Sequence, residues 1–440
     1  MKKIFLLISL LIAISCKENK TQQQDEVMLW QPYNDSIEVL ANQDHEVARM
    51  RYKLIQSKVL NKNEVFLPLY AEVSKFDEST YERIKPLVLE RNIFDIKHEI
   101  KQRNLTYEEL TLFFLYRIYK YEIDNTSTLN TVIALNKEVV HQARVLDDLV
   151  AKGLAPLSKH PIYGMPILLK DNINTAGMNT TAGSIALLEN EVDDSFIVER
   201  LKANGALILG KVNLSEWAYF LCSGCPVGYS AVGGQTLNPY GRRVFETGGS
   251  SSGSGTAMAA NYAVAAVGTE TSGSILSPSS QNSVVGLKPT IGLLSRTGIV
   301  PISSTLDTPG PMTRNIMDNV ILLSAMMGKD SADSKSVANE YAGVLSAGLH
   351  PTPFKELRLG AIQTLLDSDS IYKKSVEKLK ELGAEVVAFT PPDVAMNGFL
   401  SILNIDMRHD LPQYLNVHVK NSEGVTIRTV ADAVAFNKKD

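Results

Sequence analysis

Serine hydroxyls and one lysine are the side chains of this sequence best suited to covalent chemistry. Gly, Ser, Ala and Thr dominate the stretch from Thr247 to Ser283, in which Glu270 is the only charged residue. A serine hydroxyl is a weak nucleophile that needs a base, but none of the seven His residues lies in this stretch. A neutral lysine can be that base if burial lowers its pKa from about 10.4 towards 7. Lys170 directly follows the apolar residues 167–169, a setting that predicts burial.

Three other interpretations of residues 247–283 do not fit the composition or the spacing of these residues. A flexible Gly/Ser linker would not contain the Ala- and Val-rich segment from Ala257 to Val267. A phosphate-binding loop needs Gly-Lys-Ser/Thr, whereas Thr256 and Ala257 follow Gly255. The dinucleotide-binding fingerprint fails because no acidic residue ends a following strand at the required distance. We therefore expect a compact segment whose tight turns expose backbone N–H groups to an anion.

The elements that must position these side chains alternate between strands and helices. Such alternation is typical of an α/β domain with a mixed or parallel sheet. Before it, residues 29–94 predict a helical N-terminal extension without recognisable chemistry. The predicted strands cover residues 167–169, 206–210, 357–362 and 385–389, and the predicted helices between them cover 196–204 and 368–382.

Length and composition indicate a large globular protein. The chain has 440 residues, of which 44 are Lys or Arg and 48 are Asp or Glu, so its formal net charge is −4. A hydrophobic fraction of 44% can bury a sizeable core, which excludes wholesale disorder. The charge balance argues against nucleic acid as a partner, because phosphate binding needs a concentrated basic face.

The N-terminus predicts export. Lys2 and Lys3 precede an apolar run from Ile4 to Ile14, which is too short for a helix that spans a bilayer. The residues before Cys16 resemble a bacterial lipobox, which implies a signal peptide at 1–15, lipidation of Cys16 and a polar tether at 16–28. We therefore expect an exported protein, lipid-anchored to a bacterial cell-envelope membrane. The alternative is a plain signal peptide that contains Cys16.

Two further cysteines, Cys222 and Cys225, form a C-x-x-C pattern. No β-α-β unit frames them as in a redox motif, and neither Cys nor His supplies the further ligands that a metal site needs. We expect either a local disulfide that stiffens the loop or two free thiols, and we expect no metal and no cofactor.

Several motifs, in the same order along the chain, resemble the amidase signature hydrolases. The resemblance covers about residues 95 to 390 and implies an α/β fold, a single large domain with a central mixed β-sheet covered by helices. Within the family the chain is most similar to bacterial peptide amidases, through residues 233–239 and Glu270. The matching segments are Gly164–Asp171, Gly210–Trp217, Gly248–Gly253, Val267–Ile275, Gly286–Thr290 and Asp307–Met312.

The resemblance implies a Ser-Ser-Lys triad. Ser274 would be the nucleophile, Ser250 a bridging serine that follows a cis peptide bond, and Lys170 the base. The backbone N–H groups of Thr271, Ser272, Gly273 and Ser274 would form the oxyanion hole. Ser252 and Ser272 stand where many members have Gly or Asp, and Leu276 replaces a common Arg.

The implied reaction is hydrolysis of a non-peptide carboxamide, such as a peptide C-terminal amide, through an acyl-enzyme with release of ammonia. Its partner would be a small-molecule or peptide amide. The alternatives are an amidase for fatty-acyl or small acyl amides and a non-catalytic surface lipoprotein that binds peptide. We expect the amidase signature domain to occupy residues 95–440 and to be truncated at its C-terminus.

Overall fold

The computed structural model describes residues 27–156, 160–222, 224–338 and 352–438. Cys16, the predicted signal peptide and nearly all of the predicted tether lie outside the described residues. In the described part, no helix combines the length and the apolar character that a membrane crossing requires.

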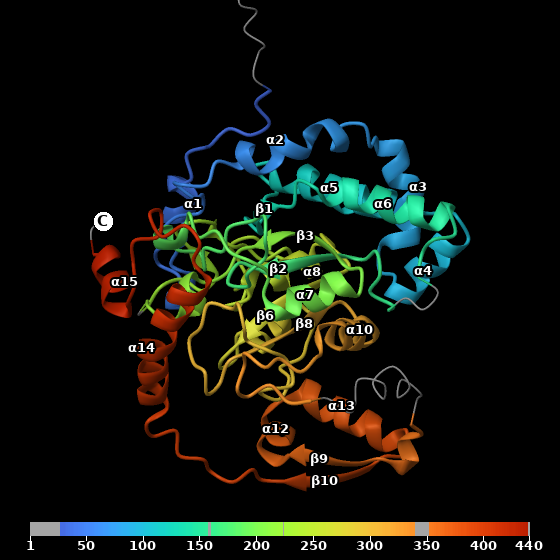
Figure 1. The fold of residues 1–440 in the computed structure, drawn as a ribbon. Coiled ribbons are helices and arrows are strands. Elements are labelled where there is room, and N and C mark those ends of the chain that lie inside the picture. Colours follow the sequence, from blue (N-terminus) through green and yellow to red (C-terminus); the bar gives the residue numbers. More distant parts are fainter. Residues whose placement is uncertain (1–26, 157–159, 223, 339–351, 439–440) are drawn as a thin grey trace, which may run out of the picture.

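A six-stranded mixed sheet forms the centre of the molecule, with the strand order β1-β3-β2-β6-β8-β7 (Figure 1). Strand β2 pairs in parallel with both β3 and β6, whereas the pairs β1–β3, β6–β8 and β7–β8 are antiparallel. This confirms the predicted α/β class and the mixed sheet. The strands are β1 (Val132–Leu135), β2 (Pro166–Lys170), β3 (Leu207–Val212), β6 (Ala265–Glu270), β7 (Val285–Gly286) and β8 (Thr308–Thr313).

Helices cover the sheet and share its apolar core. The N-terminal helices pack into the same core as the central strands, since Phe66, Ile84 and Ile96 belong to one buried cluster with Ile167 and Val267. The predicted boundary between residues 94 and 95 falls inside α4. The helices before β2 are α1 (Ser36–Leu40), α2 (Lys62–Val73), α3 (Glu78–Val88), α4 (Ile93–Lys101), α5 (Tyr107–Glu122) and α6 (Val139–Ala151).

The first predicted β-α-β unit is present. Helix α7 links β2 and β3, and α8 leads into β6, so the sequence signal for alternation is confirmed. Further helices and 3-10 turns complete the main body. The helices are α7 (Phe196–Ala203), α8 (Ser252–Ala259), α9 (Leu276–Gln281), α10 (Ile316–Met326), α14 (Phe399–His418) and α15 (Val430–Phe436); the 3-10 turns are Ala48–Met50, Ile185–Leu187, Glu216–Tyr219 and Phe354–Glu356.

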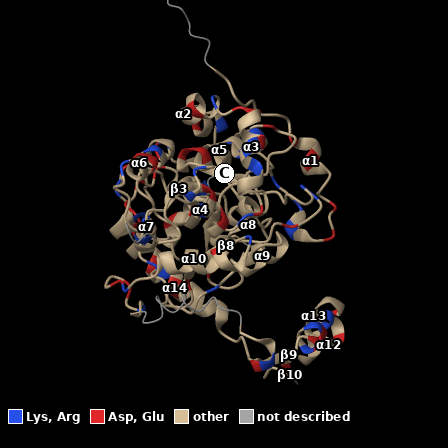
Figure 2. Cartoon of the chain, turned by 90° about the vertical axis from the view of Figure 1, so that its right-hand side faces the viewer, with Lys and Arg blue, Asp and Glu red and all other residues tan. Residues whose placement is uncertain are grey.

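The second predicted β-α-β unit forms a sheet of its own. Its two strands pair only with each other, in parallel, and do not join the central sheet. Figures 1 and 2 both show this unit beside the main body. In Figure 2, basic and acidic residues are interspersed over the outer helices. The unit consists of β9 (Arg358–Ile362), α12 (Gln363–Ser368), α13 (Ser370–Glu381) and β10 (Glu385–Phe389); a third, two-stranded sheet contains β4 (Tyr229–Ser230) and β5 (Gly234–Gln235).

Candidate active site

Lys170 ends the central strand β2 and is completely buried. Its Nζ lies 2.7 Å from Ser250 Oγ and 2.8 Å from Thr269 Oγ1, and it also donates to the Thr269 carbonyl at 3.3 Å. Burial lowers the pKa of Lys170 to about 7, although Asp307 and Glu270 act in the opposite direction. The amine therefore has a substantial neutral fraction at neutral pH, as its place after an apolar strand predicts.

Ser250 lies just before α8 and is 1% exposed. The Gly249–Ser250 peptide bond is cis, as the resemblance implies. The Ser250 carbonyl accepts a hydrogen bond from the Ser215 N–H at 3.0 Å. Helix α8 approaches the backbone after β3 closely, because the N–H of Gly253 donates to the Asn213 carbonyl. A Cβ at Gly253 would lie 2.4 Å from that carbonyl oxygen, so glycine is required there.

Ser274 lies in the turn between β6 and α9. Strands β2 and β6 are parallel neighbours, so the turn follows β6 at the same sheet edge as Lys170. The Ser274 carbonyl accepts a hydrogen bond from the Ser251 N–H at 3.1 Å, which places Ser274 beside Ser250. Its side chain is 9% exposed and has no hydrogen-bond partner within the described part of the chain. The structure thus brings all three predicted triad residues together.

The turn before Ser274 presents free backbone donors. The N–H groups of Thr271, Ser272, Gly273 and Ser274 have no hydrogen-bond acceptor among the described residues. Gly273 has a φ of +83°, and no atom lies within 4 Å of its ideal Cβ position, so the turn is open on this side. Such a run of unpaired N–H groups is suited to an oxyanion.

The side chain of Glu270 binds the backbone N–H groups that follow Ser274. Its Oε2 accepts hydrogen bonds from the N–H groups of Ile275 and Leu276, at 2.7 and 2.9 Å. The side chain is 3% exposed, so this charge is held by backbone donors at the start of α9. Leu276, which occupies the position of a common Arg, is 48% exposed. The carboxylate of Glu270 therefore fixes the backbone immediately after Ser274.

A buried ion pair supports the end of β2. Lys211 Nζ lies 3.0 Å from Asp171 Oδ1, and both side chains are fully buried. Lys211 also donates to Thr180 Oγ1 at 2.9 Å, and Asp171 accepts hydrogen bonds from the N–H and hydroxyl of Thr181. Because Asp171 follows Lys170 directly, the pair anchors the backbone that carries the lysine.

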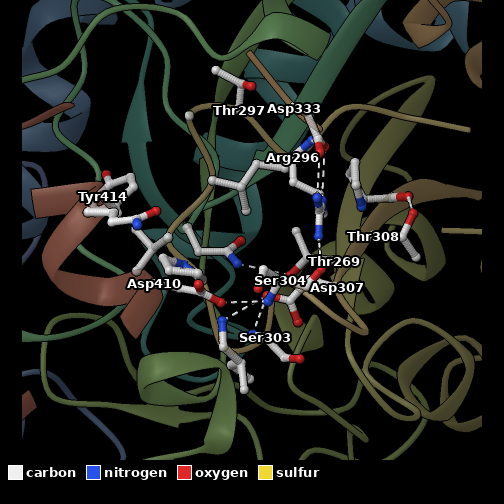
Figure 3. A pocket seen from close by; sticks show the side chains of 18 of the residues that line it. Thr269, Arg296, Thr297, Ser303, Ser304, Asp307, Thr308, Asp333, Asp410 and Tyr414 are labelled. Carbon is white, nitrogen blue, oxygen red and sulfur yellow. Dashed lines mark hydrogen bonds and ion pairs between the residues drawn. The ribbon is translucent and has the colours of Figure 1, made fainter. Parts of the chain in front are cut away.

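A cavity of about 330 Å³ adjoins these residues. Asn172, Thr269 and Thr271 contribute to its wall, and the remaining wall comes from residues 296–309, the segment around Asp333, Ala218 and α14. In Figure 3 the side chains of Arg296, Asp307 and Asp410 gather around this cavity. A cavity of this size falls at the small end of the range for ligand sites, roughly 300–1,000 Å³.

The sequence pattern of the Amidase family matches residues 109–434. The chain belongs to the amidase family. It is 38% identical to a relative from Arabidopsis thaliana that is named as a probable amidase, over 80% of this chain and 69% of the relative. A second curated relative, from Schizosaccharomyces pombe, is 35% identical, and this chain spans 57% of its length.

Solved structures of the amidase family have the same fold. The structure of an amidase family protein from Bacillus anthracis is 33% identical, with a TM-score of 0.78 over 88% of this chain and 77% of that chain. The native peptide amidase from Stenotrophomonas maltophilia is 38% identical, with a TM-score of 0.73 over 80% of this chain and 72% of that one. These matches confirm the fold class and the resemblance to an amidase hydrolase, and the similarity extends to plant and fungal proteins.

The remaining predicted site residues lie as follows. Cys16 is outside the described residues. Cys222 and Cys225 form a disulfide with a Cα–Cα distance of 5.8 Å, which decides between the two states that the sequence left open. No group of three or more potential metal ligands occurs in the described part of this amidase. Ser252 is buried at the start of α8, where its hydroxyl lies 3.2 Å from that of Thr236.

Sequence reasoning missed several residues of the site. Thr269 is a direct partner of Lys170, and Asp171 pairs with Lys211, but neither interaction has a local signal in the sequence. Asp307, like Thr269, Asp171 and Lys211, lies within a segment that resembles the family, but the resemblance assigned it no role. In the structure it accepts hydrogen bonds from Thr271 Oγ1 and from the backbone of Ile302 and Ser303, and burial raises its pKa.

Proposed function

We propose that this protein hydrolyses a non-peptide carboxamide, such as the C-terminal amide of a peptide, and releases ammonia. The contact that carries the proposal is the 2.7 Å hydrogen bond between Lys170 Nζ and Ser250 Oγ at a fully buried amine. A lysine whose pKa lies at about 7 supplies a neutral base at neutral pH. The similarity to a peptide amidase supports the choice of substrate.

In the proposed mechanism, Lys170 takes the proton of Ser250 while Ser250 takes the proton of Ser274. The Ser274 oxygen then forms a bond to the amide carbon. The N–H groups of residues 271–274 stabilise the resulting oxyanion, and one such donor is typically worth about 3–4 kcal/mol. Ser250 gives a proton to the nitrogen while Lys170 returns its proton to Ser250, the C–N bond breaks and ammonia leaves, which restores neutral Lys170. Water then hydrolyses the acyl-enzyme through the same proton relay.

The test is ammonia release by the purified protein from a panel of peptide amides and acyl amides. We expect turnover of peptide amides and a loss of at least about 100-fold in Lys170→Ala, because the relay then lacks its base. Lys152→Ala is the matched control, since Lys152 is 65% exposed and caps the C-terminus of α6, where among the described residues it pairs only with Asp148. Absence of turnover on every amide would refute the proposed function.

A second test addresses the nucleophile. A fluorophosphonate should label the protein at Ser274, and the label should be lost in Ser274→Ala. Ser280→Ala, a substitution at the end of α9, serves as the control that keeps the label. Labelling that persists in Ser274→Ala would overturn the assignment.

We also propose export and lipid anchoring through Cys16, which rests on the sequence pattern alone. Mass spectrometry of the N-terminal peptide from the intact chain should find an acylated Cys16 as its first residue. Cys16→Ser should move the protein from the membrane fraction to the aqueous fraction. An unmodified Cys16 retained within a longer N-terminus would contradict the anchor.

A further inference from the structure

One arginine lines the cavity beside the triad, and it forms an ion pair with a carboxylate of the same wall. Among its described lining residues, Arg296 is the only Lys or Arg. Its guanidinium donates to both carboxylate oxygens of Asp333, and also to the Ser304 carbonyl. Figure 3 shows these contacts converging on Arg296. The positive charge of Arg296 is therefore balanced by Asp333 within the protein, without an anionic ligand.

The charge of Arg296 is shared among three carboxylates of the cavity wall, Asp333, Asp307 and Asp410, and of these Asp410, on α14, makes no direct ion pair with it. Asp410 is 8% exposed, and its Oδ2 accepts a hydrogen bond from the Ser304 N–H at 2.6 Å. Its other oxygen lies 3.0 Å from Nδ1 of His409, a side chain that is 68% exposed. His418 also lines the cavity, but burial lowers its pKa, so its ring is neutral at pH 7.

A second acceptor in the same cavity has no partner. Asn172 is 2% exposed and lines the cavity next to Thr269, to which its Nδ2 donates at 2.9 Å. Its Oδ1 is buried and has no hydrogen-bond partner among the described residues. A buried acceptor without a donor is costly, so a ligand N–H group that reaches this oxygen would remove that cost. Asp410 and Asn172 lie on different elements and indicate the same ligand chemistry.

We propose that this cavity binds a protonated amine carried by the acyl part of the amide substrate. The proposal rests on the proposed function in one respect: because ammonia is the leaving group there, everything else in the substrate belongs to the acyl side. An ammonium group supplies the donors that Asp410 and Asn172 lack, and the charge attraction is stronger inside a partly buried cavity than in water. A carboxylate in the same place would meet like charge.

Binding to Ser274→Ala, measured by calorimetry, separates this proposal from turnover. Four small amides of matched size serve as probes: N-acetyl-lysinamide, norleucinamide with its free α-amine, neutral N-acetyl-norleucinamide, and the 1-amide of N-acetyl-glutamic acid. At least one of the two cationic probes should bind about tenfold more tightly than the neutral probe, and the anionic probe should bind most weakly. The comparison of the two cations shows whether a side-chain amine or an α-amine is recognised.

Asp410→Asn in the same background removes the charge but keeps an oxygen for the Ser304 N–H. It should reduce the cationic preference to less than about threefold, whereas Asp148→Asn, at an exposed aspartate of α6, should leave the preference intact. Equal binding of the cationic and neutral probes, absence of binding, or a preference unaffected by Asp410→Asn would each overturn the proposal. If the preference is present but the intact protein releases no ammonia, the cavity assignment stands and the proposed hydrolysis fails.

Discussion

Lys170 shows how one residue acquires its chemistry from its surroundings. Its amine has lost all contact with solvent and lies among the oxygens of Ser250 and Thr269. Loss of solvation favours the neutral form, whereas the carboxylates of Asp307 and Glu270 favour the charged form. The first effect is the larger, and the pKa settles at about 7.

The pH dependence of activity follows from this pKa. Under the proposed mechanism only neutral Lys170 is competent, and its neutral fraction rises as the pH increases through about 7. We expect kcat/KM for amide hydrolysis to fall about tenfold per pH unit below pH 6 and to level off above pH 8. Initial rates of ammonia release between pH 5 and 9 measure this. A flat profile would contradict the role of Lys170.

The Asp171–Lys211 pair predicts a large stability effect. Lys211→Met leaves the Asp171 carboxylate buried without its cation, which should lower the free energy of unfolding by about 3–5 kcal/mol. Lys152→Met, in an ion pair whose two side chains are 65% and 71% exposed, should change it by less than about 1 kcal/mol. Urea unfolding of both variants provides the comparison. Equal, small losses would show that the buried pair is dispensable.

At the scale of elements, the site depends on how closely α8 approaches the strand edge. Glycine and serine along α8 permit this approach, and Ser250 lies two residues before the first residue of the helix. The Gly253 N–H donates to the Asn213 carbonyl, which follows β3. Small residues in this stretch are therefore a packing requirement as well as a source of hydroxyl groups.

Gly253→Ala tests this packing. In a helix this substitution normally stabilises by roughly 0.5–1 kcal/mol, but here the new Cβ would lie 2.4 Å from a backbone oxygen. We expect a net loss of about 1–3 kcal/mol in unfolding free energy and reduced amide hydrolysis. At Gly328 the nearest atoms belong to the side chains of Phe196 and Arg200, which can move, so Gly328→Ala should be nearly neutral. Similar stability of the two variants would refute the close-packing argument.

Local sequence patterns predicted most helices and strands, but not which strands pair with each other. The apolar run before Lys170 and the alternation after it predicted β2, α7 and β3, whereas only the family resemblance implied that Ser250 is the partner of Lys170. The pairing of β2 with β6 joins residues about 100 positions apart, and periodicity carries no information on such contacts. For the same reason the sequence does not predict the ion pairs Asp171–Lys211 and Arg296–Asp333, which the structure shows.

At the scale of the whole molecule, the structure separates a large core from a small appended unit. The strands of the central sheet near the site are buried throughout, as in β2 and β3. In β9 and β10 most side chains are exposed or half-buried, including Phe389 at 45%. The β-α-β signal is alike in both regions, so the sequence predicted both units but not that they belong to different sheets.

This difference predicts uneven local stability. Two-stranded sheets gain little from pairing and depend on the helix that covers them. Amides of β9 and β10 should therefore exchange with solvent at least about tenfold faster than those of β2 and β3. Hydrogen–deuterium exchange followed by mass spectrometry of the intact chain measures this directly. Equal protection in the two sheets would show that the small unit is as stable as the core.

The complete burial of Lys170 also makes catalysis conditional on a finished fold. A lysine exposed in an incompletely folded chain returns to its ordinary pKa, near 10.4, and is protonated at neutral pH. The strand pairing that buries it joins distant parts of the chain, so early folding intermediates would lack the base even if their serines were in place. Under the proposed mechanism, the protein is a hydrolase that cannot act on any amide during its own synthesis.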